Sequence, residues 1–167
     1  MFRIASFLDN RLIERVFQPL SNALYLRLGM PRFRAACLGL DAAAIAWTLT
    51  QAAPLSNAVL GWQAGLAVMR GSILLLGLTA LLSLRSLFRR LSASPRPNPL
   101  RAKMLPYRCL VLLFLTTDLC HAASGGSLGA DANLAMLGFA TMALYLAACD
   151  APKLGRRWSS LARAEAA

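Results

Sequence analysis

Four long apolar segments run through this chain, and the connections between them alternate between basic and cation-free. The first three segments have about the twenty residues that a helix needs to cross the hydrocarbon core of a bilayer, and the fourth is shorter. Four such segments in succession are typical of a multi-pass membrane protein rather than of a soluble domain. The sequence therefore predicts an all-α integral membrane protein with four transmembrane helices: Ala35–Ala53, Leu66–Leu84, Leu105–Ala123 and Leu134–Cys149.

The distribution of Lys and Arg predicts how these helices are oriented. Cytoplasmic loops of membrane proteins carry an excess of Lys and Arg. Both termini and the middle connection are therefore expected on the cytoplasmic side of a bacterial-type inner membrane, with the helices paired as two hairpins. The 18 cations lie in Met1–Arg34, Arg85–Arg108 and Lys153–Ala167, apart from Arg70, and none lies in Pro54–Gly65 or Ser124–Asn133.

The composition supports a membrane location over nucleic-acid binding. Apolar residues make up 57% of the chain and charged residues only 15%, whereas soluble domains average about 25% charged residues. A net charge of +11 would suggest nucleic acid in a soluble protein, but here the cations flank apolar segments. The expected partner is a lipid bilayer with anionic headgroups, and no nucleic acid is expected.

These patterns divide the chain into five segments. Residues 1–34 are predicted to be an amphipathic interfacial helical segment, 35–84 the first transmembrane hairpin, 85–104 a basic Pro-rich cytoplasmic linker, 105–149 the second hairpin, and 150–167 a basic cytoplasmic tail. Trp62, Tyr107 and Trp158 are predicted to be anchors at headgroup depth.

The first segment has the periodicity of an amphipathic helix. Apolar residues from Ile4 to Leu24 recur every three or four positions, while Asp9, Glu14 and Gln18 fall largely on the other side. Pro19 predicts a kink near Phe17. The helix is expected to lie on the inner leaflet, and the alternative is that it packs on the apolar surface of a partner.

Three polar residues lie within the apolar segments. Counted from the segment ends, Arg70, Asp118 and His121 are all close to the outer boundary, and Asp118 and His121 share a helix face. An unpaired Arg within a membrane is costly, so Arg70 is predicted to pair with Asp118. The pair would be either an inter-helix staple or part of a small ion or solute path. Asp41 is expected to form an interfacial ion pair with Arg34 or Arg85.

Small residues predict where helices approach closely. Ala35, Gly39 and Ala43 are spaced by four residues on the first span, and Gly61 and Gly65 form a minimal GxxxG motif before the second. Such stripes serve either internal packing or oligomerisation. The third span instead carries a bulky run, which suits lipid or a larger complex.

No catalytic, cofactor-binding or metal-binding motif is present, so an enzyme and a bound cofactor are not expected. The four cysteines include no C-x-x-C pair, and no disulfide is predicted. His121 is the only histidine, which disfavours a haem.

The sequence is most consistent with a non-enzymatic accessory or assembly subunit that docks a membrane-protein partner or a second copy of itself. The alternative is a small channel, transporter or pore former that uses Arg70, Asp118 and His121. A redox subunit is a third hypothesis, and it would need a bound chromophore.

Overall fold

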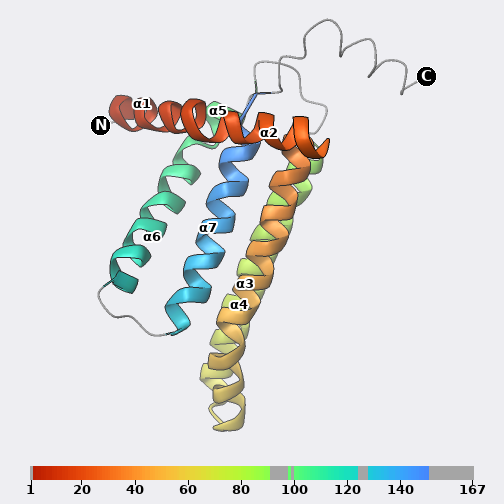
Figure 1. Ribbon diagram of the computed structural model, residues 1–167. Helices are drawn as coiled ribbons and strands as arrows, with labels where there is room; N and C mark the ends of the chain where they lie inside the picture. The colour runs from red at the N-terminus through yellow and green to blue at the C-terminus, as the bar shows by residue number, and fades with distance from the viewer. Residues whose placement is uncertain (1, 91–97, 99, 124–127, 151–167) are drawn as a thin grey trace, which may run out of the picture.

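The computed structural model describes residues 2–90, 98, 100–123 and 128–150, and every element in these residues is helical (Figure 1). The all-α prediction is confirmed for this part of the chain. The elements are α1 (Phe2–Leu12), the π-helical turn η1 (Ile13–Phe17), α2 (Gln18–Leu28), α3 (Arg32–Leu60), α4 (Ala64–Arg90), α5 (Leu100–Lys103), α6 (Leu105–Ala123) and α7 (Leu128–Ala148).

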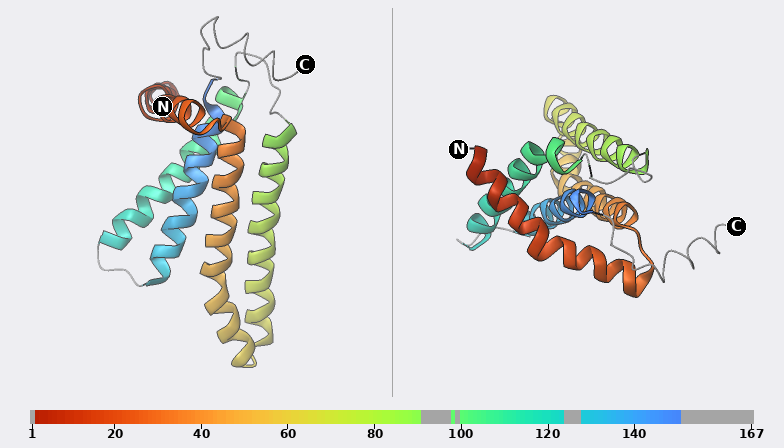
Figure 2. Two further views of the ribbon diagram at one scale, coloured as in Figure 1. Left: turned by 45° about the vertical axis from the view of Figure 1, so that its right-hand side comes forward. Right: turned by 90° about the horizontal axis from the view of Figure 1, so that it is seen from above.

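The four long helices form an open row rather than a closed bundle. α3 and α4 make one antiparallel hairpin, and α6 and α7 make the other (Figure 2). α3 packs against both α4 and α7, and α6 packs against α7, which gives the order α6, α7, α3, α4. α4 therefore has α3 as its main neighbour and leaves much of its surface outside the core.

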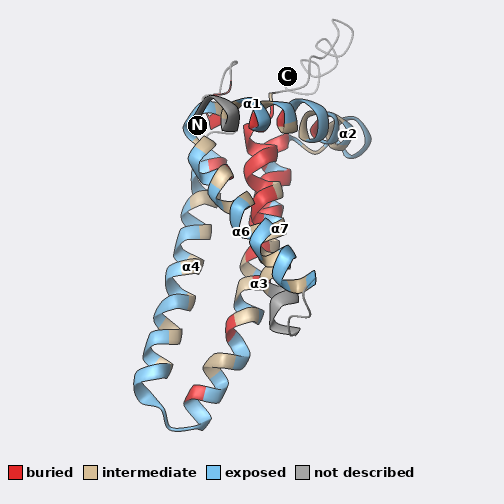
Figure 3. Ribbon diagram, turned by 90° about the vertical axis from the view of Figure 1, so that its left-hand side faces the viewer, coloured by how far each residue is buried: buried red, intermediate tan, exposed pale blue. Residues whose placement is uncertain are grey.

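The centre of the row is held by small residues. Ala35, Gly39 and Ala43 of α3 are buried, and α3 and α7 share the most extensive packing. A Cβ atom at Gly39 would lie 3.1 Å from the Cβ atom of Ala143 and 3.3 Å from the carbonyl oxygen of Phe139. The glycine thus lets the backbones of α3 and α7 approach closely. Figure 3 shows that burial is concentrated in this part of α3 and α7.

The two hairpins differ in length. α3 and α4 have 29 and 27 residues, whereas α6 and α7 have 19 and 21. At 1.5 Å per residue the first hairpin is about 40 Å long and the second about 30 Å. Figure 1 shows the tip of the first hairpin extending well beyond the end of the second.

The predicted end of the first helix at Ala53 is wrong, because α3 continues as a helix through Pro54 to Leu60. Proline removes only one backbone donor, and the hydrogen bonds of its neighbours maintain the helix. The turn that joins α3 to α4 is confined to residues 61–63. Trp62 lies in this turn with a φ of 53° and a side chain that is 95% exposed.

The segment formed by α1, η1 and α2 lies across one end of the row (Figure 1). This end, called the basic end below, carries the start of α3, the end of α4 and the helix α5, with the cations Arg32, Arg34, Arg89, Arg90, Arg101 and Lys103. The π-helical turn ends at Phe17, two residues before Pro19, which agrees with the irregularity predicted near Phe17.

The faces of this N-terminal segment differ from the prediction. Asp9, Ile13 and Ser21 are buried against the row, whereas Leu8 and Val16 are exposed. Periodicity had placed Asp9 on the outer polar side. The carboxylate of Asp9 faces inward instead because it meets a buried arginine of α6.

One helix of the described residues, α4, is long and apolar enough to cross a membrane, and no residue in its most apolar stretch is buried within the chain. Polar residues interrupt the apolar sequence of α3 at Asp41 and Gln51 and that of α6 at Arg108 and Asp118. The apolar part of α7, Asn133–Ala148, is shorter. The four-span topology therefore stays a prediction.

Candidate functional site

A buried ion pair joins the N-terminal segment to the row at the basic end. Arg108 of α6 donates from Nε to Asp9 Oδ1 at 3.0 Å and from Nη2 to Asp9 Oδ2 at 2.6 Å, with side-chain exposures of 0% and 4%. The guanidinium also donates to the carbonyl oxygens of Leu100 and Arg101. Because both charges are compensated, the pair can be buried without an unsatisfied ion.

Aromatic contacts surround this ion pair. The guanidinium carbon of Arg108 lies 5.6 Å from the ring centroid of Tyr145 on α7. The ring of Phe17 stacks on the ring of Tyr145, with centroids 4.6 Å apart. These contacts exclude water from the charges, which strengthens their attraction.

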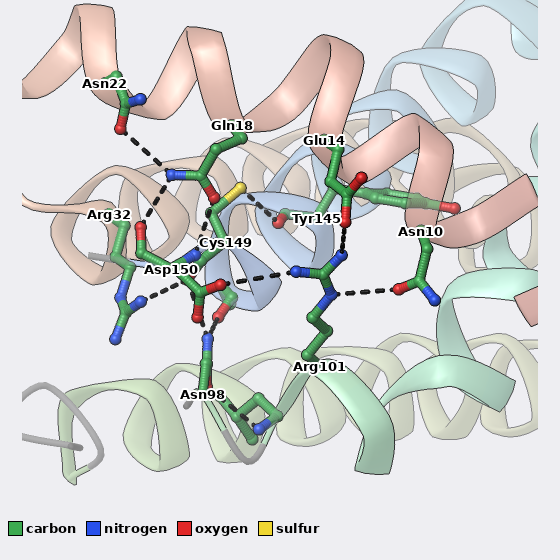
Figure 4. A network of polar contacts seen from close by, with 12 residues as sticks. Asn10, Glu14, Gln18, Asn22, Arg32, Asn98, Arg101, Tyr145, Cys149 and Asp150 are labelled. Carbon is green, nitrogen blue, oxygen red and sulfur yellow. Dashed lines mark hydrogen bonds and ion pairs between the residues drawn. The ribbon is translucent and has the colours of Figure 1, made fainter. Parts of the chain in front are cut away.

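Arg101 of α5 forms a second junction, which Figure 4 shows from close by. Its Nε donates to Asn10 Oδ1 at 3.1 Å and its Nη2 to Glu14 Oε1 at 2.7 Å. Its Nη1 lies 3.5 Å from Asp150 Oδ2. One guanidinium thus ties the linker helix to the N-terminal segment and to the end of α7.

The last carbonyls of α7 are satisfied by side chains from distant segments. Asn98 donates to the carbonyl oxygens of Ala147 and Cys149, at 2.7 and 3.0 Å, and its own Oδ1 accepts from the backbone N–H of Leu100 at 3.1 Å. Arg32 also donates to the carbonyl oxygen of Cys149. A buried helix end requires such donors, because its final carbonyls lack helical partners.

Gln18 completes this network on the side of α2. Its Nε2 donates to the carbonyl oxygen of Asp150 at 3.0 Å, while its Oε1 accepts from the backbone N–H of Asp150 at 2.9 Å (Figure 4). The side-chain amide of Gln18 therefore both donates to and accepts from the backbone of Asp150, as a neighbouring strand would. Together these contacts close the basic end of the row and position the N-terminal segment on it.

Sequence reasoning missed the pairing of Asp9 with Arg108. The available signal was the position of Arg108 within the first turn of an apolar segment, where a charge needs a partner. Arg108 was counted only among the cations that predict the orientation of the helices, so no partner was sought for its charge. The expected pairing of Asp41 is simpler: it binds Arg85, with Nε 2.6 Å from Oδ1.

The structure does not bring Arg70 and Asp118 together. Asn133 of α7 donates a hydrogen bond to Asp118, and Arg70 forms no ion pair with any residue in the described ranges. Counted from the basic end, Arg70 lies about 10 Å deeper than Asp118 at 1.5 Å per residue, because the hairpins differ in length. His121 lies one turn after Asp118 on α6 and is exposed.

The remaining predicted packing and anchor residues are dispersed. Gly61 caps α3, where a Cβ atom would lie 3.0 Å from the carbonyl oxygen of Asn57, while Gly65 has open space around it. Tyr107 at the start of α6 is exposed, as is Trp62 at the opposite hairpin tip. Trp158 and the Pro-rich stretch 94–97 lie outside the described residues.

An apolar groove, called the groove below, opens between α4 and α6 over α3 and α7. Its volume is about 410 Å³. Because α4 and α6 occupy opposite ends of the row, the groove is the concave face that an open arrangement leaves. It is lined by Leu40, Ala80, Leu81, Ser83, Leu84, Leu87, Met104, Tyr107, Val111, Ala140 and Leu144.

The cysteines and other metal-ligating side chains are scattered. All four cysteines are free thiols, with Cys37 and Cys149 buried and Cys120 exposed. Among the described residues, no three His, Cys, Asp or Glu side chains gather as a metal site would require.

No protein-family model matches this chain, and no curated protein or solved structure is significantly similar to it. The fold and the site therefore define only a class: an all-helical protein of two hairpins in an open row, closed at its basic end by an N-terminal helical segment.

Proposed function

We propose that this protein is a non-enzymatic, multi-pass membrane protein that acts as an accessory or assembly subunit. In this proposal it binds a transmembrane helix of a partner protein in the groove. The four long helices span a bacterial-type inner membrane, with the basic end and both termini on the cytoplasmic side.

The exposed apolar surface of α4 carries the proposal. Leu75 and Leu76 are 64% and 75% exposed, and the most apolar stretch of α4 contains no buried residue. Soluble monomers rarely leave so large an apolar surface in water. Lipid or a partner must therefore cover α4.

The shape of the groove favours a partner helix in addition to lipid. Its lining includes the small residues Ala80 and Ser83 on α4 and Ala140 on α7. Small residues allow a second helix backbone to approach closely, which is the main source of helix association in membranes. Lipid chains have no comparable requirement for small residues.

The N-terminal segment suits the membrane surface in this arrangement. It lies across the helix ends and exposes both apolar side chains, such as Phe7 and Leu8, and the cation Arg11. This combination favours binding at a headgroup interface. The separation of Arg70 from Asp118 leaves the channel hypothesis without the ion pair on which it was based.

Occlusion of the groove tests the proposal. Ala80→Trp places a bulky ring in the groove, and Leu82→Trp adds the same ring at the same depth on the opposite, exposed side of α4. Each variant is purified gently from native membranes, and copurifying proteins are quantified by mass spectrometry.

The expected result is a stoichiometric partner that the native chain and Leu82→Trp retain and Ala80→Trp loses. Retention of the same partner by Ala80→Trp would overturn docking in the groove. Purification of the native chain without any partner would overturn the accessory role.

A further inference from the structure

A second cavity, called the arginine pocket, lies at the basic end between the start of α3 and the end of α4. Its volume is about 370 Å³. It is separate from the groove, since the two share no lining residue. The arginine pocket is lined by Pro31, Phe33, Arg34, Cys37, Leu38, Asp41, Arg85 and Arg89.

The charge of the arginine pocket favours an anion. Three guanidinium groups line it, from Arg34, Arg85 and Arg89, against the single carboxylate of Asp41. Asp41 is engaged by Arg85, with Nη2 2.9 Å from Oδ2 in addition to the Nε contact. Among the residues that line the pocket, the three arginines therefore outnumber the one acidic residue.

The helix geometry adds to this potential. The pocket includes Pro31 and Phe33 at the N-terminus of α3, a helix of 29 residues that has no side-chain cap. The N-terminus of a long helix carries a partial positive charge that attracts anions. Guanidinium groups and a helix N-terminus together match the chemistry of a phosphate group.

The rest of the lining is apolar. Phe33 and Leu38 provide hydrocarbon walls beside the cations, and Leu38 is 50% exposed on the outer surface of α3. A free phosphate ion makes no favourable contact with these hydrocarbon side chains, whereas a phospholipid presents a phosphate joined to acyl chains that can pack on them. Basic residues at this level of a membrane protein recognise anionic headgroups.

We infer that the arginine pocket binds the phosphate of an anionic phospholipid from the leaflet at the basic end, with an acyl chain running along Leu38. Arg34 and Arg89 hold the phosphate, and Arg85 is positioned by Asp41. This inference rests on the membrane embedding in the proposed function, but not on the groove or on a partner.

The test measures lipid binding by the full chain in detergent, with phosphatidylglycerol and phosphatidylcholine as probes in native mass spectrometry. Arg34→Gln/Arg89→Gln removes two cations from the pocket. Arg27→Gln/Arg90→Gln is the matched control, because it removes two exposed cations that do not line the pocket. Thermal unfolding of each variant checks that the fold is retained.

The native chain and the control should bind phosphatidylglycerol in preference to phosphatidylcholine, and the pocket variant should bind it about tenfold or more weakly. Equal affinity of the two double variants would overturn the site. A second arm uses inorganic phosphate alone. Phosphate binding at the same arginines with an affinity equal to that of the lipid would overturn the phospholipid as the ligand.

These results are independent of the groove experiment. Loss of partner binding in Ala80→Trp is measured by copurification, whereas the arginine pocket is measured by lipid affinity. A negative result in one experiment therefore does not change the result expected in the other.

Discussion

At the scale of single residues, Arg108 has the most demanding environment in the described chain. It is fully buried, yet it is charged, and its guanidinium donates four hydrogen bonds, two to Asp9 and one to each of two backbone carbonyls. Such a pair contributes less to stability than its distances suggest, since both ions lose their hydration. The pair also fixes the position of α1 on α6, because it joins one residue of each helix at two points.

The first prediction concerns this ion pair. Arg108→Met leaves the carboxylate of Asp9 buried without its partner, which should lower the free energy of unfolding by about 3–5 kcal/mol. Denaturant unfolding in detergent measures the loss. The double variant Asp9→Leu/Arg108→Met removes both charges and should recover most of it. A double variant as unstable as Arg108→Met would contradict this explanation.

A second prediction compares Gly77 and Gly71 of α4. A Cβ atom at Gly77 would lie 2.2 Å from Nε1 of Trp47, which itself donates to the carbonyl oxygen of Leu74 at 3.2 Å. Gly77→Ala should therefore displace Trp47 and cost about 1–3 kcal/mol. Gly71→Ala is the control, because Gly71 has open space and alanine favours a helix by about 1 kcal/mol. Equal melting temperatures for the two variants would contradict the packing of α3 on α4.

At the scale of elements, the N-terminal segment acts as a clamp on the basic end. Gln18 donates a hydrogen bond to the backbone at the end of α7, and Asp9 accepts one from α6. Arg101 of α5 donates a hydrogen bond to Glu14. Helices of one hairpin can associate through their connecting turn, but the two hairpins need contacts between distant segments. The packing of α3 on α7 supplies most of these contacts, and the clamp adds others at the basic end, where the helix ends would otherwise leave unpaired backbone groups.

Asn98 provides the third prediction, which tests this capping. Asn98→Ala leaves two buried carbonyl oxygens at the end of α7 without this donor, and it should cost about 1–3 kcal/mol. Asn57→Ala, at an exposed position near the hairpin tip, is the matched control and should have little effect. Hydrogen exchange should also accelerate in the last turn of α7 in the first variant alone. No change in exchange there would rule out the capping role.

The sequence predicted the elements better than their contacts. Apolar runs and basic blocks indicated four long helices and a fifth, amphipathic one at the N-terminus. They could not reveal that α3 continues past Pro54, because one proline is compatible with a helix as well as with a turn. They also placed Asp9 on the outer side, since periodicity groups residues by face but does not identify a partner about a hundred positions away, such as Arg108.

The predicted site depended on an assumption about depth. Arg70 and Asp118 were placed at one level by counting from the segment ends, which holds only when both hairpins have the same length. The longer first hairpin separates the two residues, and Asn133 takes the place of Arg70 as the partner of Asp118. The groove and the arginine pocket could not be predicted because each combines helices that are not neighbours in sequence.

At the scale of the whole molecule, the open row is the feature on which the proposed function depends. A closed bundle would bury more of the surface of α4. Here α4 packs mainly on α3, exposes its apolar surface and forms one wall of the groove. The cations of the basic end, including those of the arginine pocket, lie together at one end of the row. The clamp covers the same end.

The central claim is that the row spans a membrane with its basic end on the cytoplasmic side. Cysteine labelling in intact cells tests it, with a maleimide that cannot cross the inner membrane. Trp62→Cys places a thiol at the exposed hairpin tip, and Arg90→Cys places one at the basic end. The parent chain with its natural cysteines provides the background.

Trp62→Cys should be labelled in intact cells, and Arg90→Cys only after the membrane is permeabilised. Labelling of both positions from the same side, or labelling of Arg90→Cys alone before permeabilisation, would contradict the account.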